Sequence, residues 1–235
     1  MRATNDQLLN SFAIRSFRDV ADGDYIAARM ACRAQLHFQY LWSSQQAIEK
    51  YVKCILLLHR IPAKEIKHDL SAGLAAIESS GKLKLNLVRP TEEFIAYIDR
   101  YGQSRYFEIS NHANGHDLVR LDRSVWELRR FCTLDHSPRA LVLRDRMAIP
   151  KVRLAGQLEA IIDNAKHPAR EPLLWQNGFF GRRSRKKVAL PEWKVASNAP
   201  LYLDPHLLDE VLKYVHLPKS LISAYRSHQK KGPEF

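Results

Sequence analysis

Residues 40–58 read YLWSSQQAIEKYVKCILLL, and this stretch decides the fold class. It contains neither Gly nor Pro, and its apolar residues recur every three or four positions. That spacing places the apolar side chains on one face of a helix. Glu49 and Lys53 are four residues apart, the spacing of a favourable ion pair on a helix surface. The stretch therefore predicts a long amphipathic helix that packs against other helices.

Helical signals also occur on both sides of this stretch. The sequence Asp-Gly-Asp at 22–24 suits a helix start, because carboxylates there face the positive end of the helix dipole. Asp69, between His68 and Leu70, suits the same position of another helix. The predicted helices span about 24–34, 70–79, 91–101 and 116–134, and residues 5–19 predict a short amphipathic arm. The pattern predicts a mainly α fold with about five helices.

The composition excludes several classes of protein. The chain has 235 residues, of which 46% are apolar and 26% charged, and these are globular values. No apolar run reaches the roughly 18–20 residues that cross a bilayer. The N-terminus lacks the layout of a signal peptide. We therefore expect a cytoplasmic location and no membrane partner.

The cysteines and the missing motifs argue against metal and cofactor chemistry. Cys32, Cys54 and Cys132 are odd in number, far apart and embedded in apolar helical stretches. This pattern predicts buried, reduced thiols rather than a disulfide or a zinc site. The phosphate-binding loop, the dinucleotide-binding glycine pattern and the zinc-protease motif do not occur in the sequence. We expect no metal and no cofactor.

Two separated motifs resemble the HEPN domain, a helical domain of prokaryotes and higher eukaryotes. The first is Gln-Ala-Ile-Glu-Lys-Tyr-Val-Lys at 46–53, and the second is His-Asp-Leu at 68–70. The resemblance covers about residues 20–137. It implies a bundle of about five helices, often dimeric. Many members of the family are metal-independent ribonucleases of the toxin or defence type, and others are inactive or partner nucleotidyltransferases.

Active members of this family use an Arg followed by His after four to six residues. Arg105 and His112 fit this spacing, and so do Arg129 and Arg130 with His136, about as many pairs as chance predicts. In such a site the His transfers a proton and the Arg stabilises charge on the phosphate. We take Arg105 and His112 as the first candidate and Arg129 with His136 as the second. The alternative for Arg105 is a structural role between two helices.

The net charge of +12 is concentrated in the last hundred residues. Residues 1–135 carry a net charge of +3, and residues 136–235 carry +9. Five cations fall within 182–187, namely Arg182, Arg183, Arg185, Lys186 and Lys187. Phe179 and Phe180 lie just before them between two glycines, which predicts a mobile loop suited to a nucleic-acid backbone and to stacking on bases. The alternative is a solvated loop without a specific ligand.

Together these observations predict three parts. They are an arm at 1–19, a HEPN-like bundle at 20–137 and a basic, partly irregular extension at 138–235. Two segments could form short strands instead of irregular chain, 82–88 in the bundle and 188–195 in the extension. The expected function is that of an RNA-associated protein with metal-independent ribonuclease activity, most often as a homodimer. The alternative is a helical module without catalysis that dimerises, binds a protein partner or binds a nucleotide.

Overall fold

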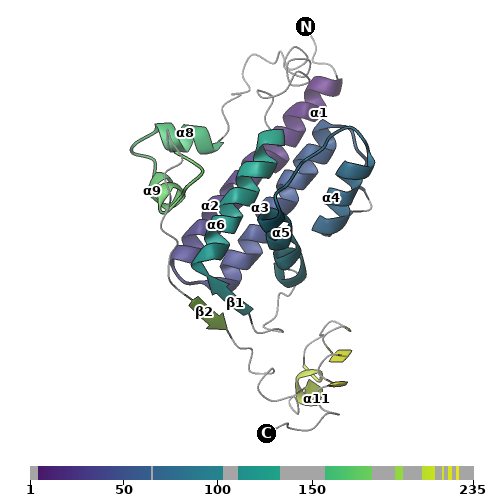
Figure 1. Ribbon diagram of the computed structural model, residues 1–235, viewed down its shortest axis with the longest axis vertical. Coiled ribbons are helices and arrows are strands. Elements are labelled where there is room, and N and C mark those ends of the chain that lie inside the picture. The colour runs from purple at the N-terminus through teal and green to yellow at the C-terminus, as the bar shows by residue number, and fades with distance from the viewer. Residues whose placement is uncertain are drawn as a thin grey trace.

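The structure is a computed structural model that describes residues 5–64, 66–102, 111–132, 157–181, 194–197, 208–214, 219, 222–223 and 226–227. This part of the chain is mainly helical, as the sequence predicts (Figure 1). Its elements are α1 (Asn5–Ala13), the π-helix η1 (Ile14–Arg18), α2 (Asp19–Arg33), α3 (His37–Leu58), α4 (Leu70–Ser79), α5 (Arg89–Gly102), β1 (Asn111–Asn114), α6 (Gly115–Arg129), the 3-10 helix η2 (Arg130–Cys132), α8 (Gln157–Asp163), α9 (Arg170–Leu174), β2 (Lys194–Ser197) and α11 (Leu208–Val211). None of the described helices is both long enough and apolar enough to cross a membrane.

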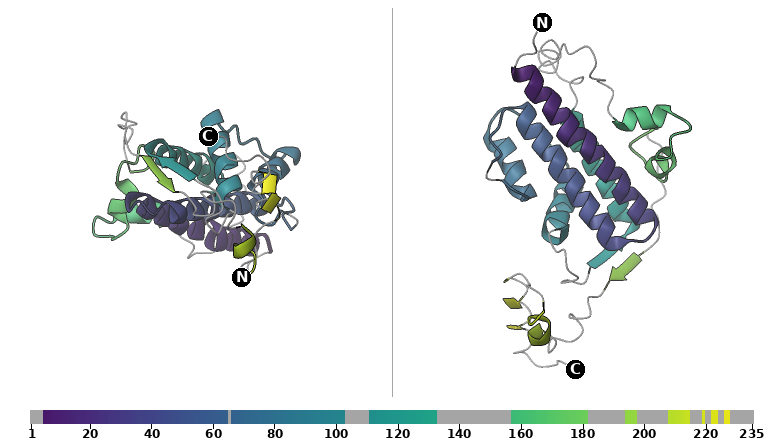
Figure 2. Two further views of the ribbon diagram at one scale, coloured as in Figure 1. Left: turned by 90° about the horizontal axis from the view of Figure 1, so that it is seen from below. Right: turned by 180° about the vertical axis from the view of Figure 1, so that it is seen from behind.

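α1, η1 and α2 form one continuous helix, which Figure 2 shows from behind along the bundle. At its π-turn the N–H of Asp19 donates to the carbonyl of Ile14, so the helix continues with a wider turn. The helix start predicted at 22–24 is wrong, and the predicted arm is the first part of this helix. Asp22 lies in mid-helix and is buried, because groups from two other helices bond to it.

The bundle core lies between α2, α3, α5 and α6, which run side by side with α4 at one edge and α8 and α9 at the other (Figure 1). The apolar stripe predicted in residues 40–58 is buried, as expected. The other helices contribute buried side chains to the same cluster, among them Tyr25 and Ile26 of α2, Phe94 and Ile98 of α5, and Leu121 and Val125 of α6. The three cysteines are free and buried, as predicted.

The start of α4 is fixed by two carboxylates. Asp69 is its N-cap, and its Oδ1 accepts a hydrogen bond of 2.7 Å from the N–H of Ala72, as the sequence predicts. Asp99 of α5 accepts from the N–H groups of Leu70 and Ser71, each at 3.1 Å. The first-turn N–H groups of a helix lack helical partners, so these bonds hold the connection between α3 and α4 in place.

Residues 157–181 pack on the bundle, although they fall within the predicted extension. Leu158 and Ile161 of α8, Leu173 of α9, and Phe180 are buried in the same cluster as the helices of the bundle. This part of the extension therefore completes the core.

β1 and β2 form an antiparallel pair in which Asn111 is opposite Ser197 and Asn114 is opposite Lys194. The sequence predicts a loop and turn at 111–115, whereas the structure has a strand that leads directly into α6 at Gly115. The alternative strand at 82–88 is wrong, because these residues connect α4 to α5 without forming a strand, and Asn86 among them has a φ of +48°. The one at 188–195 overlaps β2 from Lys194 onward, and its residues before Lys194 lie outside the described ones.

Candidate functional site

Two of the residues predicted to act in catalysis, His112 and Arg129, fall within the described part of the chain. His112 lies within β1, where its backbone pairs with β2. Arg105, His136 and the basic run at 182–187 lie outside the described residues. Their roles stay predictions.

The β1–β2 ladder links the strand of His112 to the basic run. Asn114, two residues after His112, is opposite Lys194 in the ladder. The basic run ends seven residues before Lys194 in the sequence. Seven residues span at most about 25 Å even when fully extended. The run is therefore tethered to the strand that carries the predicted proton-transfer residue, although about 70 residues separate them in the chain.

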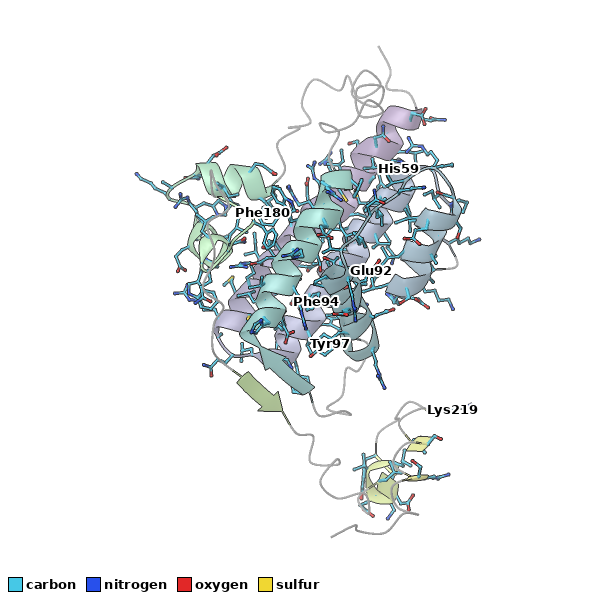
Figure 3. The ribbon with its side chains drawn as sticks, viewed as in Figure 1. His59, Glu92, Phe94, Tyr97, Phe180 and Lys219 are labelled. Atoms are coloured by element: carbon cyan, nitrogen blue, oxygen red, sulfur yellow. The ribbon has the colours of Figure 1, made fainter. Side chains whose placement is uncertain are left out.

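Asn177 anchors the segment that precedes the basic run. Its Oδ1 accepts hydrogen bonds from the N–H groups of Phe179 and Phe180, at 2.9 and 3.0 Å, and its Nδ2 donates to Tyr25 Oη at 2.9 Å. Phe180 is buried against Tyr25, between the α8–α9 segment and the bundle (Figure 3). The predicted mobile loop that presents both aromatic rings to bases is therefore wrong for Phe180, which is a core residue, and Phe179 is half-buried.

The same segment is fastened to the bundle by Arg29. This side chain is fully buried and donates to the Asp122 carboxylate and to the carbonyls of Pro172 and Trp175. Tyr25 Oη donates to the same Asp122 oxygen at 2.7 Å. Burial, and then the charge of Asp122, raise the pKa of Tyr25 well above its usual value, so the hydroxyl remains a donor. We call Tyr25, Arg29, Asp122 and Asn177 the Arg29 cluster.

Arg129 is the centre of a second buried group. Its guanidinium donates to both oxygens of Asp22, at 2.7 and 2.8 Å, and to both oxygens of Glu159 in α8, at 2.6 and 2.7 Å. Tyr51 Oη donates to Asp22 at 2.7 Å. We call Asp22, Tyr51, Arg129 and Glu159 the Arg129 cluster. These contacts engage the guanidinium with carboxylates and give it a structural role, whereas the pairing with His136 stays a prediction.

The charge of Arg129 changes the pKa of Glu159. Partial burial alone would raise the pKa of this carboxyl, but the hydrogen bonds and the charge of Arg129 outweigh it, so the pKa is lowered. Glu159 is therefore held as a carboxylate that ties α8 to α6.

The two motifs of the HEPN resemblance meet in a third group, at the surface between α3 and α4. Glu49 accepts from Gln45 Nε2 at 3.3 Å and from Lys53 Nζ at 2.5 Å. His68 Nδ1 lies 3.1 and 3.2 Å from the two oxygens of Glu49. The side chain of Glu49 is 8% exposed, whereas that of His68 is 66% exposed. We call Gln45, Glu49, Lys53 and His68 the Glu49 cluster.

No protein-family model, curated protein or solved structure matches the chain. The HEPN resemblance therefore rests on the motif residues alone. The function has to be inferred from the contacts of the described residues and from the chemistry of their side chains.

The three clusters differ in what they can do. The Arg29 cluster is buried, and so is the Arg129 cluster apart from Glu159; both are internally paired, so they suit the task of holding α8 and α9 on the bundle. The Glu49 cluster reaches solvent through an imidazole, which is a group able to transfer protons near neutral pH. Among the described residues, no group of three or more His, Cys, Asp or Glu side chains is placed to hold a metal ion.

Proposed function

We propose that the protein binds RNA through the basic run at 182–187 and cleaves it without a metal ion, with Arg105 and His112 as the reacting pair. The observation that carries this proposal is the pairing of β1 with β2, which tethers the basic run to the strand of His112. Cations that hold an RNA backbone must lie near the group that acts on it. The ladder supports such an arrangement for segments that the sequence alone leaves unrelated.

The proposed chemistry needs few groups. The RNA 2′-hydroxyl is the nucleophile, His112 accepts its proton, and Arg105 stabilises the charge that develops on the phosphate. The cations of the basic run pair with neighbouring phosphates and release their counterions.

The binding part of the proposal is tested by salt dependence. Replacing the five cations at 182–187 with Gln should weaken the binding of single-stranded RNA. The slope of log affinity against log salt concentration should become less negative, by up to about 3.5 if each cation pairs with one phosphate. A matched control variant loses the same number of positive charges at exposed positions elsewhere. In it, Gln replaces Arg15, Lys64, Arg89, Lys213 and Arg226. Equal slopes for the two variants would contradict a specific role for the run.

The catalytic part is tested by cleavage assays in EDTA. His112→Ala and Arg105→Ala should each slow cleavage by about 10²–10⁴-fold, the usual contribution of a positioned proton-transfer or charge-stabilising group. His59→Ala, at the opposite end of α3 from β1, is the control. Wild-type rates in both variants would remove this pair from the mechanism.

One observation favours the second candidate function, a non-catalytic interaction module. Leu8, Phe12 and Val20 are 44–54% exposed and recur along the outer side of the α1–α2 helix. Exposed apolar side chains in a row are typical of protein interfaces. We infer that, in this alternative, a second copy of the chain or a protein partner covers this face. Sedimentation of wild type and Phe12→Ser over a range of concentrations tests it, since a monomer at all concentrations argues against a homodimer.

A further inference from the structure

We propose that His68, held by Glu49 and assisted by Lys53, is a catalytic residue for cleavage of RNA phosphodiesters, at a site distinct from the Arg105–His112 pair. This inference takes from the proposed function that the substrate is RNA. It rests on the Glu49 cluster, all of whose side chains the structure describes.

The first reason is the way in which the imidazole is held. His68 Nδ1 faces the Glu49 carboxylate at 3.1 Å, so Nδ1 carries the proton in the neutral ring and Nε2 keeps a lone pair. The ring is 66% exposed, which leaves Nε2 accessible to a ligand. A carboxylate behind an exposed imidazole fixes both its tautomer and its orientation, as general-base catalysis requires.

The second reason is the support behind Glu49. Gln45 donates to this carboxylate and accepts in turn from Gln46 Nε2 at 2.7 Å. Gln46 accepts from Lys50 Nζ at 3.2 Å, and Lys50 also pairs with Asp24 of α2 at 2.6 Å. A chain of hydrogen bonds therefore runs from α2 across α3 to the carboxylate. Such a network restricts Glu49 to one orientation, which is what a preorganised site needs.

The third reason is the backbone at Lys67, which immediately precedes His68. Its φ is +45°, in the left-handed region that residues other than Gly seldom adopt. Gln35, Arg60, Asn86 and Gln176 also have positive φ. Gln35, Arg60 and Gln176 each follow the end of a helix, where that conformation is common, and Asn adopts it more readily than most residues. Lys67 instead lies in a tight turn closed by a hydrogen bond from the N–H of Asp69 to the carbonyl of Ile66. Strain of this kind gathers at functional sites, and here it lies directly beside His68, whose imidazole contacts Glu49.

The fourth reason is the cation beside the dyad. Lys53 Nζ lies 2.5 Å from Glu49 and its side chain is 25% exposed. An ammonium has three N–H donors, so one bond to Glu49 leaves donors for a phosphate oxygen. The cluster thus combines a base with a cation that can stabilise an anionic transition state.

The reaction follows from these groups. His68 Nε2 removes the proton from a ribose 2′-hydroxyl, and the oxygen attacks the adjacent phosphorus while Lys53 stabilises a non-bridging oxygen. The bond from phosphorus to the 5′ oxygen breaks, and the departing oxygen takes a proton from solvent. Protonated His68 then returns its proton to solvent. The products are a 2′,3′-cyclic phosphate and a 5′-hydroxyl.

The test compares variants that keep or remove the bond to Glu49. In His68→Asn the side-chain amide N–H takes the place of Nδ1–H, so the connection to α3 is kept and the base is lost. Because the Arg105–His112 pair would cleave independently of His68, cleavage is measured in an Arg105→Ala background. We expect His68→Asn to leave the melting temperature and the binding of a single-stranded RNA oligonucleotide unchanged, and to slow the remaining cleavage in EDTA by about 10²–10⁴-fold. His59→Asn, ten residues beyond Glu49 and labelled in Figure 3, is the matched control and should cleave normally.

A second readout separates catalysis from structure. In the same Arg105→Ala background, added imidazole should restore part of the cleavage rate that His68→Ala loses, because a free base can occupy the space of the missing ring, and it should not affect His59→Ala. Cleavage that His68→Asn leaves unchanged in the Arg105→Ala background would overturn this inference and leave the proposed function standing. RNA binding by the wild-type chain without any cleavage would overturn this inference and the catalytic part of the proposed function, and would leave its binding part standing. A chain that does not bind RNA at all would instead overturn the proposed function and this inference with it.

Discussion

Replacing Arg129 with Ala should destabilise the protein strongly, because it leaves a buried carboxylate without its counter-ion. Asp22 is fully buried, and in the variant it would keep only Tyr51 Oη at 2.7 Å and a long bond of 3.4 Å from the N–H of Leu158. Glu159 is 44% exposed and can return to water, so most of the cost comes from Asp22. Breaking a buried ion pair by removing one partner costs about 3–5 kcal/mol. That is a large part of the roughly 5–15 kcal/mol that stabilises a domain.

The assay is urea unfolding followed by far-ultraviolet circular dichroism. Arg89→Ala is the control, because Arg89 pairs with Glu93 four residues away at the surface, where such pairs contribute about 0.3–0.5 kcal/mol. We expect Arg129→Ala to lower the free energy of unfolding by several kcal/mol more than Arg89→Ala. A loss below about 1 kcal/mol, similar to the control, would refute the reasoning that Arg129 neutralises a buried charge.

Three further predictions concern the same core. Gly73→Ala should destabilise by about 1–3 kcal/mol in urea unfolding, because the new Cβ would lie 2.7 Å from Val52 Cγ1. Gly23→Ala, whose new Cβ would have no atom within 4 Å, should stabilise by about 0.5–1 kcal/mol, and the reverse order of the two variants would contradict the packing of α4 on α3. Burial raises the pKa of Cys32 to about 12, so iodoacetamide at pH 8 should leave it unlabelled in the native protein and label it after unfolding; rapid native labelling would be inconsistent with this. Because the pKa of Glu159 is lower in the folded protein than its ordinary value of 4.5, the Glu159 carboxylate stabilises the fold at pH values above 4.5. This stabilisation is lost as the pH falls through the pKa of the folded state, so the unfolding midpoints of wild type and Glu159→Gln should converge in acid. A gap that is independent of pH would show that the charge of Glu159 is not involved.

The sequence predicts those features of the fold that depend on local signals. The apolar spacing of residues 40–58 predicts α3 to within three residues at its start, and Asp69 caps α4 as expected. Both signals act within one or two turns of helix, so no knowledge of the partner elements is needed.

Features that depend on distant partners are not predicted. The sequence at 22–24 has the local pattern of a helix start, but Asp22 bonds with Arg129, 107 residues away, and this pairing keeps it in mid-helix. A signal was present, because Asp22 lies on the same apolar face as Tyr25 and Ile26, and a carboxylate on an apolar face requires a buried partner. The identity of that partner is not encoded locally.

The candidate site shows the same division. The motifs at 46–53 and 68–70 are visible in the sequence, whereas the bond between Glu49 and His68 that joins them depends on how α4 returns along α3. The pairing of β1 with β2 likewise brings the strand of His112 to the segment after the basic run, across a separation that no local pattern spans.

We propose that this chain binds RNA and cleaves it without a metal ion. The most direct measurement incubates the full-length protein with a labelled single-stranded RNA oligonucleotide in EDTA, beside a DNA oligonucleotide of the same sequence, and determines the ends of any products. We expect the RNA to be cut to fragments with 2′,3′-cyclic phosphate and 5′-hydroxyl ends, and the DNA, which lacks the 2′-hydroxyl, to stay intact. RNA that stays intact in EDTA, or that is cut only when a divalent metal ion is added, would contradict it.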